Sequence, residues 1–154
     1  MSKRLRDRAR HKGRRGGETM RFAYIPEDVM LSRAWQTLPH AAKAILQILV
    51  VGQVPEKNGS LACTDSYAVK YGFSSRETVQ RSLRSIEQRR LAIRTRQGIK
   101  MKGVPTLWAV TWWPIHNSGG WPLAQPQPPT YAYQSWRPDG EEPPDTEENL
   151  SPRS

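Results

Sequence analysis

Two helical patterns separated by a glycine lie in the middle of the chain, and they limit the folds open to it. The first, 64–71, starts with a threonine that suits a helix N-cap and ends at Gly72. The second begins with Ser74 and Glu77 in capping-box spacing and continues to about Arg90. The sequence therefore predicts a short helix, a tight turn and a longer helix in direct succession.

The apolar positions of two segments recur at helical spacing. In the longer of the two helices above, Val79, Leu83 and Ile86 fall at i, i+4 and i+7. An earlier segment, 39–51, shows the same pattern at Ala42, Ile45, Leu46, Leu49 and Val50. These two faces predict a helical core, and we expect Trp35 and Leu38 to anchor the preceding segment to it.

Two strand patterns follow the helices. Apolar and polar residues alternate over 91–95 and again over 107–112, and the intervening 97–105 contains turn-forming glycines and a proline. We expect a β-hairpin with a loop longer than the common two to five residues. The short stretch 60–63 is expected to form a single edge strand.

Charge divides the 154-residue chain into three parts. The net charge is +10, from 24 Lys and Arg against 14 Asp and Glu, and such an excess favours an anionic partner. Residues 1–20 form a basic arm, 21–114 a single domain, and 115–154 a proline-rich acidic tail. We expect the arm and most of the tail to be disordered. The arm either only solubilises the chain or contacts the anionic partner, and both interpretations stay open.

The tail contains more aromatic residues than a plain linker. Trp121, Tyr131, Tyr133 and Trp136 either pack back on the domain or present a motif to a protein partner. We favour packing back.

The order helix, short strand, helix, turn, helix and hairpin resembles a known family. The residues that carry the resemblance are Ala68, Gly72, Ser75-Arg76-Glu77-Thr78-Val79, Leu83, Ile86-Glu87 and Leu91-Ala92-Ile93. They are similar to prokaryotic winged helix-turn-helix DNA-binding proteins of phages, plasmids and other mobile elements, over roughly Phe22 to Pro114. The resemblance implies an α+β fold, mainly α with a small β-hairpin wing.

This resemblance implies a function and a set of contact residues. A recognition helix presents one polar face to the major groove, where arginine pairs with guanine and glutamine with adenine. Arg76 and Gln80 are the expected base readers, and Ser75 and Thr78 are expected to hold phosphates at the positive helix end. The full expected DNA-binding set is Ser75, Arg76, Thr78, Gln80, Arg81, Arg84, Arg96, Lys100 and Lys102.

The expected role is that of a transcriptional regulator or a replication accessory factor of a bacterial mobile element, acting on duplex DNA. Two alternatives stay open: a protein-interaction module on a winged-helix scaffold, and an RNA-binding protein. A homodimer, and a protein partner for the tail, also stay open.

Little in the sequence points to catalysis. Cys63 is the only cysteine, so the chain forms no intramolecular disulfide, and a thiolate zinc site needs more cysteines. The three histidines lie in separate segments, and no phosphate-binding glycine motif is present. No apolar run is long enough to cross a bilayer. We therefore expect no enzyme, no cofactor, no metal and no membrane partner, and a cytoplasmic, nucleoid-associated protein.

Overall fold

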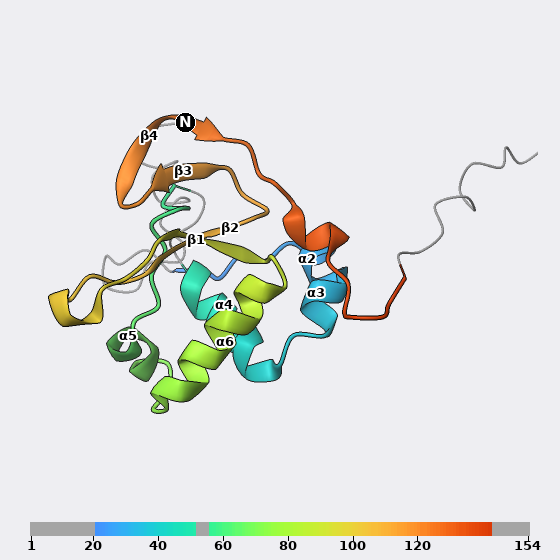
Figure 1. Ribbon diagram of the computed structural model, residues 1–154, viewed down its shortest axis with the longest axis horizontal. Coiled ribbons are helices and arrows are strands. Elements are labelled where there is room, and N and C mark those ends of the chain that lie inside the picture. Colours follow the sequence, from blue (N-terminus) through green and yellow to red (C-terminus); the bar gives the residue numbers. More distant parts are fainter. Residues whose placement is uncertain (1–20, 52–55, 143–154) are drawn as a thin grey trace, which may run out of the picture.

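The computed structural model describes residues 21–51 and 56–142, and they form a mixed α+β fold with two small antiparallel hairpins (Figure 1). The basic arm and the end of the acidic tail lie outside the described residues. The elements in chain order are α2 (Glu27–Leu31), α3 (Arg33–Gln36), α4 (His40–Val50), α5 (Asp65–Val69), α6 (Arg76–Gln88), β1 (Ala92–Arg96), η1 (Lys100–Lys102), β2 (Leu107–Val110), β3 (Ile115–Ser118), β4 (Trp121–Gln127) and η2 (Ala132–Ser135).

Helices α4 and α6 pack against each other and supply most of the helical core (Figure 1). Every apolar position expected on the two helices is buried, and Ile48 of α4 joins them. Burying each Val, Leu or Ile side chain among them contributes about 1.5–3 kcal/mol. Leu38 is buried and Trp35 packs on the same cluster, as expected. The periodicity of the sequence therefore identified the core correctly.

The turn between α5 and α6 differs from the expected capping box. Thr64 caps α5 as expected, its Oγ1 accepting a hydrogen bond from the Tyr67 N–H at 3.2 Å. The N-cap of α6 is Ser75 and not Ser74, and its Oγ accepts from the Thr78 N–H at 3.3 Å. The helix therefore starts one residue later than the expected box requires.

Strands β1 and β2 form an antiparallel hairpin that packs on the helices, and Leu61 adds one bridge to it. Leu61 and Trp108 exchange two backbone hydrogen bonds of 3.1 and 2.8 Å. The expected alternation is wrong for β2, because all four of its residues are buried. It is also wrong for Ile93, whose side chain is exposed while neighbouring Ala92 is buried. Both faces of β2 are therefore covered by other parts of the chain.

Asn58 fixes part of that cover. Its buried side chain accepts the Val110 N–H through Oδ1 at 2.8 Å and donates from Nδ2 to three carbonyl oxygens, those of Val110, Trp113 and Pro114, at 3.0–3.2 Å. Next to it, Gly59 lies so close to the Asn117 carbonyl that a Cβ would be 1.7 Å from that oxygen. The turn around Lys57 therefore locks the end of β2 to the start of β3.

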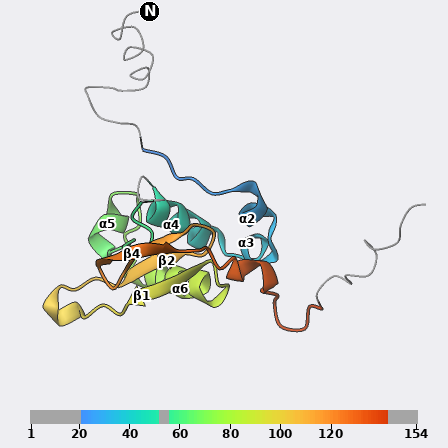
Figure 2. The same ribbon diagram turned by 90° about the horizontal axis from the view of Figure 1, so that it is seen from above.

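The expectation of a mostly disordered tail is wrong for residues 115–142. Strands β3 and β4 pair in a second antiparallel hairpin, and η2 returns to α2 and α3 (Figures 1 and 2). Tyr133 is completely buried and its hydroxyl donates to Asp28 Oδ2 at 2.9 Å. Its ring meets Trp112 edge to face, with centroids 6.3 Å apart. Packing back on the domain is thus confirmed for Tyr133 and for half-buried Trp136, whereas Trp121 and Tyr131 are exposed.

Candidate nucleic-acid interface

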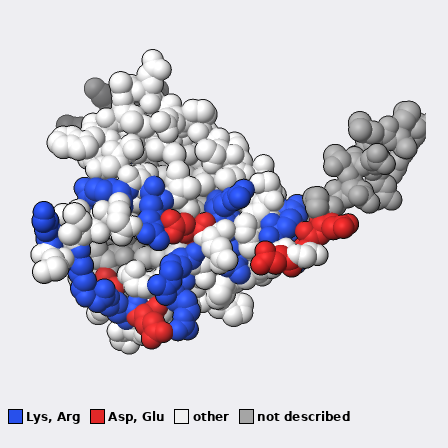
Figure 3. Space-filling model, in the orientation of Figure 1, with Lys and Arg blue, Asp and Glu red and all other residues white. Residues whose placement is uncertain are grey.

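Helix α6 exposes a polar face next to its core face. At about 100° per residue, Arg76, Gln80 and Arg84 lie in one arc, and all three side chains are exposed. Lys and Arg side chains gather over the part of the surface where α6 and the β1–β2 loop lie, with a few acidic side chains between them (Figure 3). The structure therefore brings most of the expected DNA-binding residues to one side of the molecule.

Two of these arginines are engaged by carboxylates. Arg76 Nε lies 3.3 Å from Asp65 Oδ2, which links the first residue of α6 to the first residue of α5. Arg81 donates to Glu77 Oε1 at 2.6 Å, one turn earlier on the same helix. Both pairs are largely exposed, so each contributes less than about 1 kcal/mol to stability. The expected role of Glu77 in a capping box is wrong, because it pairs with Arg81.

Asp65 differs from Glu77, the other acidic residue on this face. Its Oδ1 is buried and has no hydrogen-bond partner among the described residues, while Oδ2 holds Arg76. An unpaired buried carboxylate oxygen is costly, although the positive end of α5 offsets part of this cost. The contact uses Arg76 Nε, so the two terminal nitrogens of Arg76 keep the geometry needed for bidentate recognition. The sequence offered no sign of this pair.

The two hydroxyl residues expected to bind phosphate have structural contacts at the start of α6. Ser75 Oγ accepts the Thr78 N–H, as described above, and Ser75 is exposed. Thr78 is half-buried behind it. A phosphate at this end of the helix would therefore meet free backbone N–H groups and the Ser75 hydroxyl proton, whereas Thr78 is less accessible.

The β1–β2 loop carries two exposed lysines at its tip. Lys100 and Lys102 belong to the 3-10 turn η1, which projects from the body of the molecule (Figure 2). Ile99 and Val104 close the base of η1 with two backbone hydrogen bonds of 2.9 and 3.1 Å. Gly98 lies at the neck of this loop, where a Cβ would be 2.5 Å from the Thr106 nitrogen.

Arg96 has a more enclosed position than the sequence suggested. Its guanidinium donates to the Pro105 carbonyl at 3.1 Å and to the Gly119 carbonyl at 3.5 Å. It thereby ties the β1–β2 loop to the β3–β4 turn and is half-buried. Arg94 is likewise engaged: it donates to Glu87 Oε2 at 2.6 Å and stacks 5.4 Å from the centroid of the Trp108 ring.

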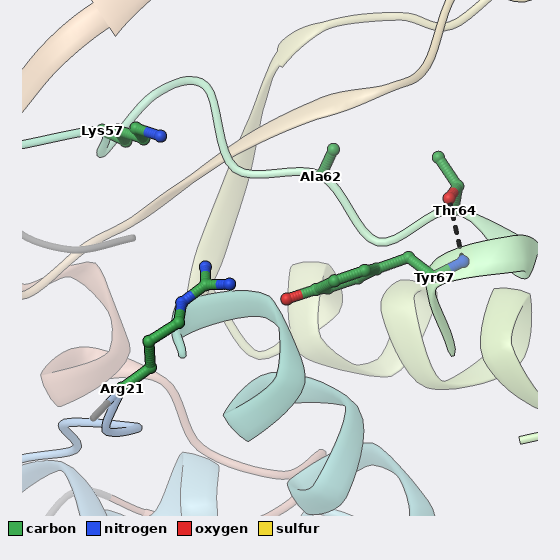
Figure 4. Close-up of a pocket in the computed structure, with 5 residues that line it drawn as sticks. All are labelled: Arg21, Lys57, Ala62, Thr64 and Tyr67. Atoms are coloured by element: carbon green, nitrogen blue, oxygen red, sulfur yellow. Dashed lines mark hydrogen bonds between the residues drawn. The ribbon is translucent and has the colours of Figure 1, made fainter. Parts of the chain in front are cut away.

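A shallow pocket of about 300 Å³ lies beside the start of α5 (Figure 4). Arg21, Lys57, Ala62, Thr64 and Tyr67 line it, and the guanidinium of Arg21 points toward the Tyr67 hydroxyl (Figure 4). Two cations and no carboxylate among its lining residues suit a phosphate-sized anion. Arg21 and Lys57 lie outside the helix-turn-helix segment, so no sequence motif marked them as contact residues.

Two further residues, Cys63 and Arg89, make contacts inside the fold. Cys63 is buried, and burial together with the nearby Asp65 charge raises the pKa of its thiol to about 11, which opposes reactivity. Arg89 donates to the Thr37 carbonyl at 3.0 Å and lies 5.1 Å from the Trp136 ring centroid, so it joins α6 to α3 and the C-terminal segment. Desolvation lowers the pKa of Arg89.

Residues 21–51 and 56–142 contain neither a candidate metal site nor a candidate membrane span. No group of three or more His, Cys, Asp or Glu side chains is placed to hold a metal ion. No helix in these ranges is both long enough and apolar enough to span a bilayer.

No protein-family model matches the chain, and no curated protein and no solved structure matches it.

Proposed function

We propose that the chain is a winged helix-turn-helix protein that binds duplex DNA sequence-specifically, with α6 in the major groove and the β1–β2 loop against the backbone. One observation carries the proposal: Gln80 and Arg84 are exposed on α6, outside the arc of its buried Val79, Leu83 and Ile86. The major groove admits one helix, whose polar face then meets base edges. The exposed Lys100 and Lys102 supply phosphate contacts on the loop.

The order of the elements supports this proposal. Helix α4, the Leu61 bridge, α5, α6 and the β1–β2 hairpin follow one another as in the winged helix-turn-helix pattern. Within that arrangement, the role we propose is regulation of transcription or assistance to replication in a mobile element.

The proposed DNA contacts divide into two groups with different roles. Arg76 and Gln80 would read base edges, because they lie in the first two turns of α6. Arg84, Lys100 and Lys102 would bind phosphates, and they have no carboxylate partner among the described side chains. Phosphate contacts give affinity and strong salt dependence, whereas base contacts give sequence preference.

Fluorescence anisotropy with labelled mixed-sequence duplex tests the binding step. We expect the full chain to bind, and we expect the affinity to fall steeply as salt rises because each phosphate contact releases counterions. Arg84→Ala should weaken binding, whereas Lys43→Ala should not, since the Lys43 ammonium lies over the Trp35 ring on α3. The proposal fails if the chain binds no duplex at low salt, or if structured RNA competes far better than duplex DNA.

A further inference from the structure

A long part of the chain carries no formal charge. From Gly103 to Trp136 the sequence contains no Asp, Glu, Lys or Arg, although charged residues make up 25 % of the chain. This stretch includes β2, which is buried, and the whole β3–β4 hairpin, which is not. The hairpin surface is correspondingly bare of charge, next to the basic surface of α6 (Figure 3).

The hairpin is more exposed than its composition favours. Six of the seven residues of β4 are exposed, and Trp121 keeps 78 % of its surface in contact with solvent. Among the described strands β4 pairs with β3 alone. A two-stranded hairpin is marginally stable by itself. This one is held to the body at β3, whose His116 and Asn117 N–H groups donate to the Asn58 carbonyl, and at its turn, where Arg96 donates to the Gly119 carbonyl.

The charge distribution favours a second copy of the chain as the partner that covers the β3–β4 hairpin. Two molecules that each carry +10 repel one another through most of their surfaces. The hairpin itself carries no charged side chain, and Arg96, which lies against its turn, is half-buried, so two copies meet few like charges there. A two-fold axis brings the same patch of both copies together. An acidic partner would instead be attracted to the basic surface of α6.

Side chains, rather than backbone hydrogen bonds between strands, must form the contact between two hairpins. Pro122 and Pro126 lack the N–H that a further strand would accept, so β4 cannot extend its sheet across the interface. An exposed tryptophan is the residue type most often found at the energetic centre of an interface. The β1–β2 hairpin lies between the β3–β4 hairpin and α6 (Figure 1).

We propose that the β3–β4 hairpin, centred on Trp121, is a self-association surface that pairs two copies of this chain. This pairing goes beyond DNA binding and does not require it.

Sedimentation equilibrium of the full chain over a concentration series tests the pairing. The wild type should approach twice the monomer mass, and added salt should strengthen the pairing by screening repulsion. Trp121→Ala should weaken association by about tenfold or more. Trp121→Lys should abolish it. Met101→Lys adds the same charge to a fully exposed position on the other hairpin and should leave association unchanged.

Circular dichroism and thermal unfolding of each variant confirm that it is folded. A wild type that stays monomeric overturns the proposal, and so does a folded Trp121→Lys variant that pairs like the wild type. Anisotropy with duplex DNA on the same samples separates this outcome from DNA binding. Pairing without DNA binding would refute the proposed function alone, and DNA binding by a strict monomer would refute the pairing alone.

Discussion

Asp65 holds Arg76 through one carboxylate oxygen while its other oxygen is buried without a partner among the described residues. If Arg76 reads a base, this contact limits the positions that the guanidinium adopts before DNA arrives. Asp65 would then raise specificity and lower affinity, because its negative charge also repels phosphate.

Replacing Asp65 by asparagine should therefore separate the two effects. We expect Asp65→Asn to bind mixed-sequence duplex more tightly, because the repulsion is removed. We expect its discrimination between bases at the position contacted by Arg76 to fall by about tenfold, which corresponds to about 1.4 kcal/mol. Binding to a preferred and a mutated duplex, measured side by side, gives both quantities.

Glu77→Gln is the matched control for Asp65→Asn. Glu77 is an exposed acid on the same face and pairs with Arg81 rather than with Arg76. Its removal should also raise general affinity but should keep the base preference. If both variants keep the wild-type preference, Asp65 has no positioning role.

Asn58 is the residue whose loss should cost the most stability for its size. Its side chain makes four hydrogen bonds to the backbone after and within β2, and it is fully buried. Asn58→Ala leaves the Val110 N–H without this acceptor, so we expect a loss of about 3 kcal/mol in the free energy of unfolding. Urea denaturation measures it.

Lys57→Ala, in the same turn, should change stability by less than about 0.5 kcal/mol because Lys57 is exposed. Equal effects of the Asn58 and Lys57 substitutions would show that the hydrogen bonds of Asn58 contribute nothing particular.

At the scale of elements, the β1–β2 loop and α6 should affect DNA binding differently. Lys100→Ala combined with Lys102→Ala should weaken binding to all sequences alike. The slope of log affinity against log salt should become less steep by about 1.8, since each lost phosphate contact accounts for about 0.9. If the slope of log affinity against log salt equals that of Lys43→Ala, the β1–β2 loop is not part of the DNA interface.

Because Tyr133 of η2 is buried, the free energy of unfolding should depend on pH in the alkaline range. Burial, helped by the hydrogen bond to Asp28, raises the pKa of Tyr133 from 10.0 to about 12. A raised folded-state pKa means that the protonated phenol stabilises the fold fully below pH 10, and this contribution is lost as pH rises from 10 to about 12.

Tyr133→Phe should lose about 1 kcal/mol at neutral pH, from the missing hydrogen bond, but should decline less steeply than the wild type between pH 10 and 12. Urea unfolding at several pH values checks this. Parallel declines would show that Tyr133 does not titrate in this range. The Cys63 thiol, with a pKa of about 11, is common to both proteins and cancels in the comparison.

For the molecule as a whole, the parts predicted correctly from sequence are those with a strong repeating pattern. The spacing of Val79, Leu83 and Ile86 identified the buried face of α6, and the glycine-rich interval between the strands identified the long hairpin loop. The N-cap was misplaced because two serines stand side by side and either fits a helix start. Local pattern therefore determined most of the helical core.

The parts that sequence reasoning missed depend on distant contacts. The β3–β4 hairpin is rich in proline and lacks apolar alternation, so nothing local distinguished it from a disordered tail. The pairing of Arg76 with Asp65 and the engagement of Arg96 by Gly119 arise only when separate elements meet. Composition could indicate a basic protein, but it could not show which cations are free to contact DNA.

The molecule combines a basic surface over α6 with an uncharged one over β3 and β4 (Figure 3). The proposed function requires that α6 reads base edges in duplex DNA. Selection of bound duplexes from a randomised library by the full chain, repeated with Gln80→Ala, tests that claim most directly. The wild type should enrich one motif and prefer it over a shuffled duplex by about tenfold or more, while Gln80→Ala should bind both with similar affinity. No enrichment by the wild type, or the same motif and preference for Gln80→Ala, would contradict the account.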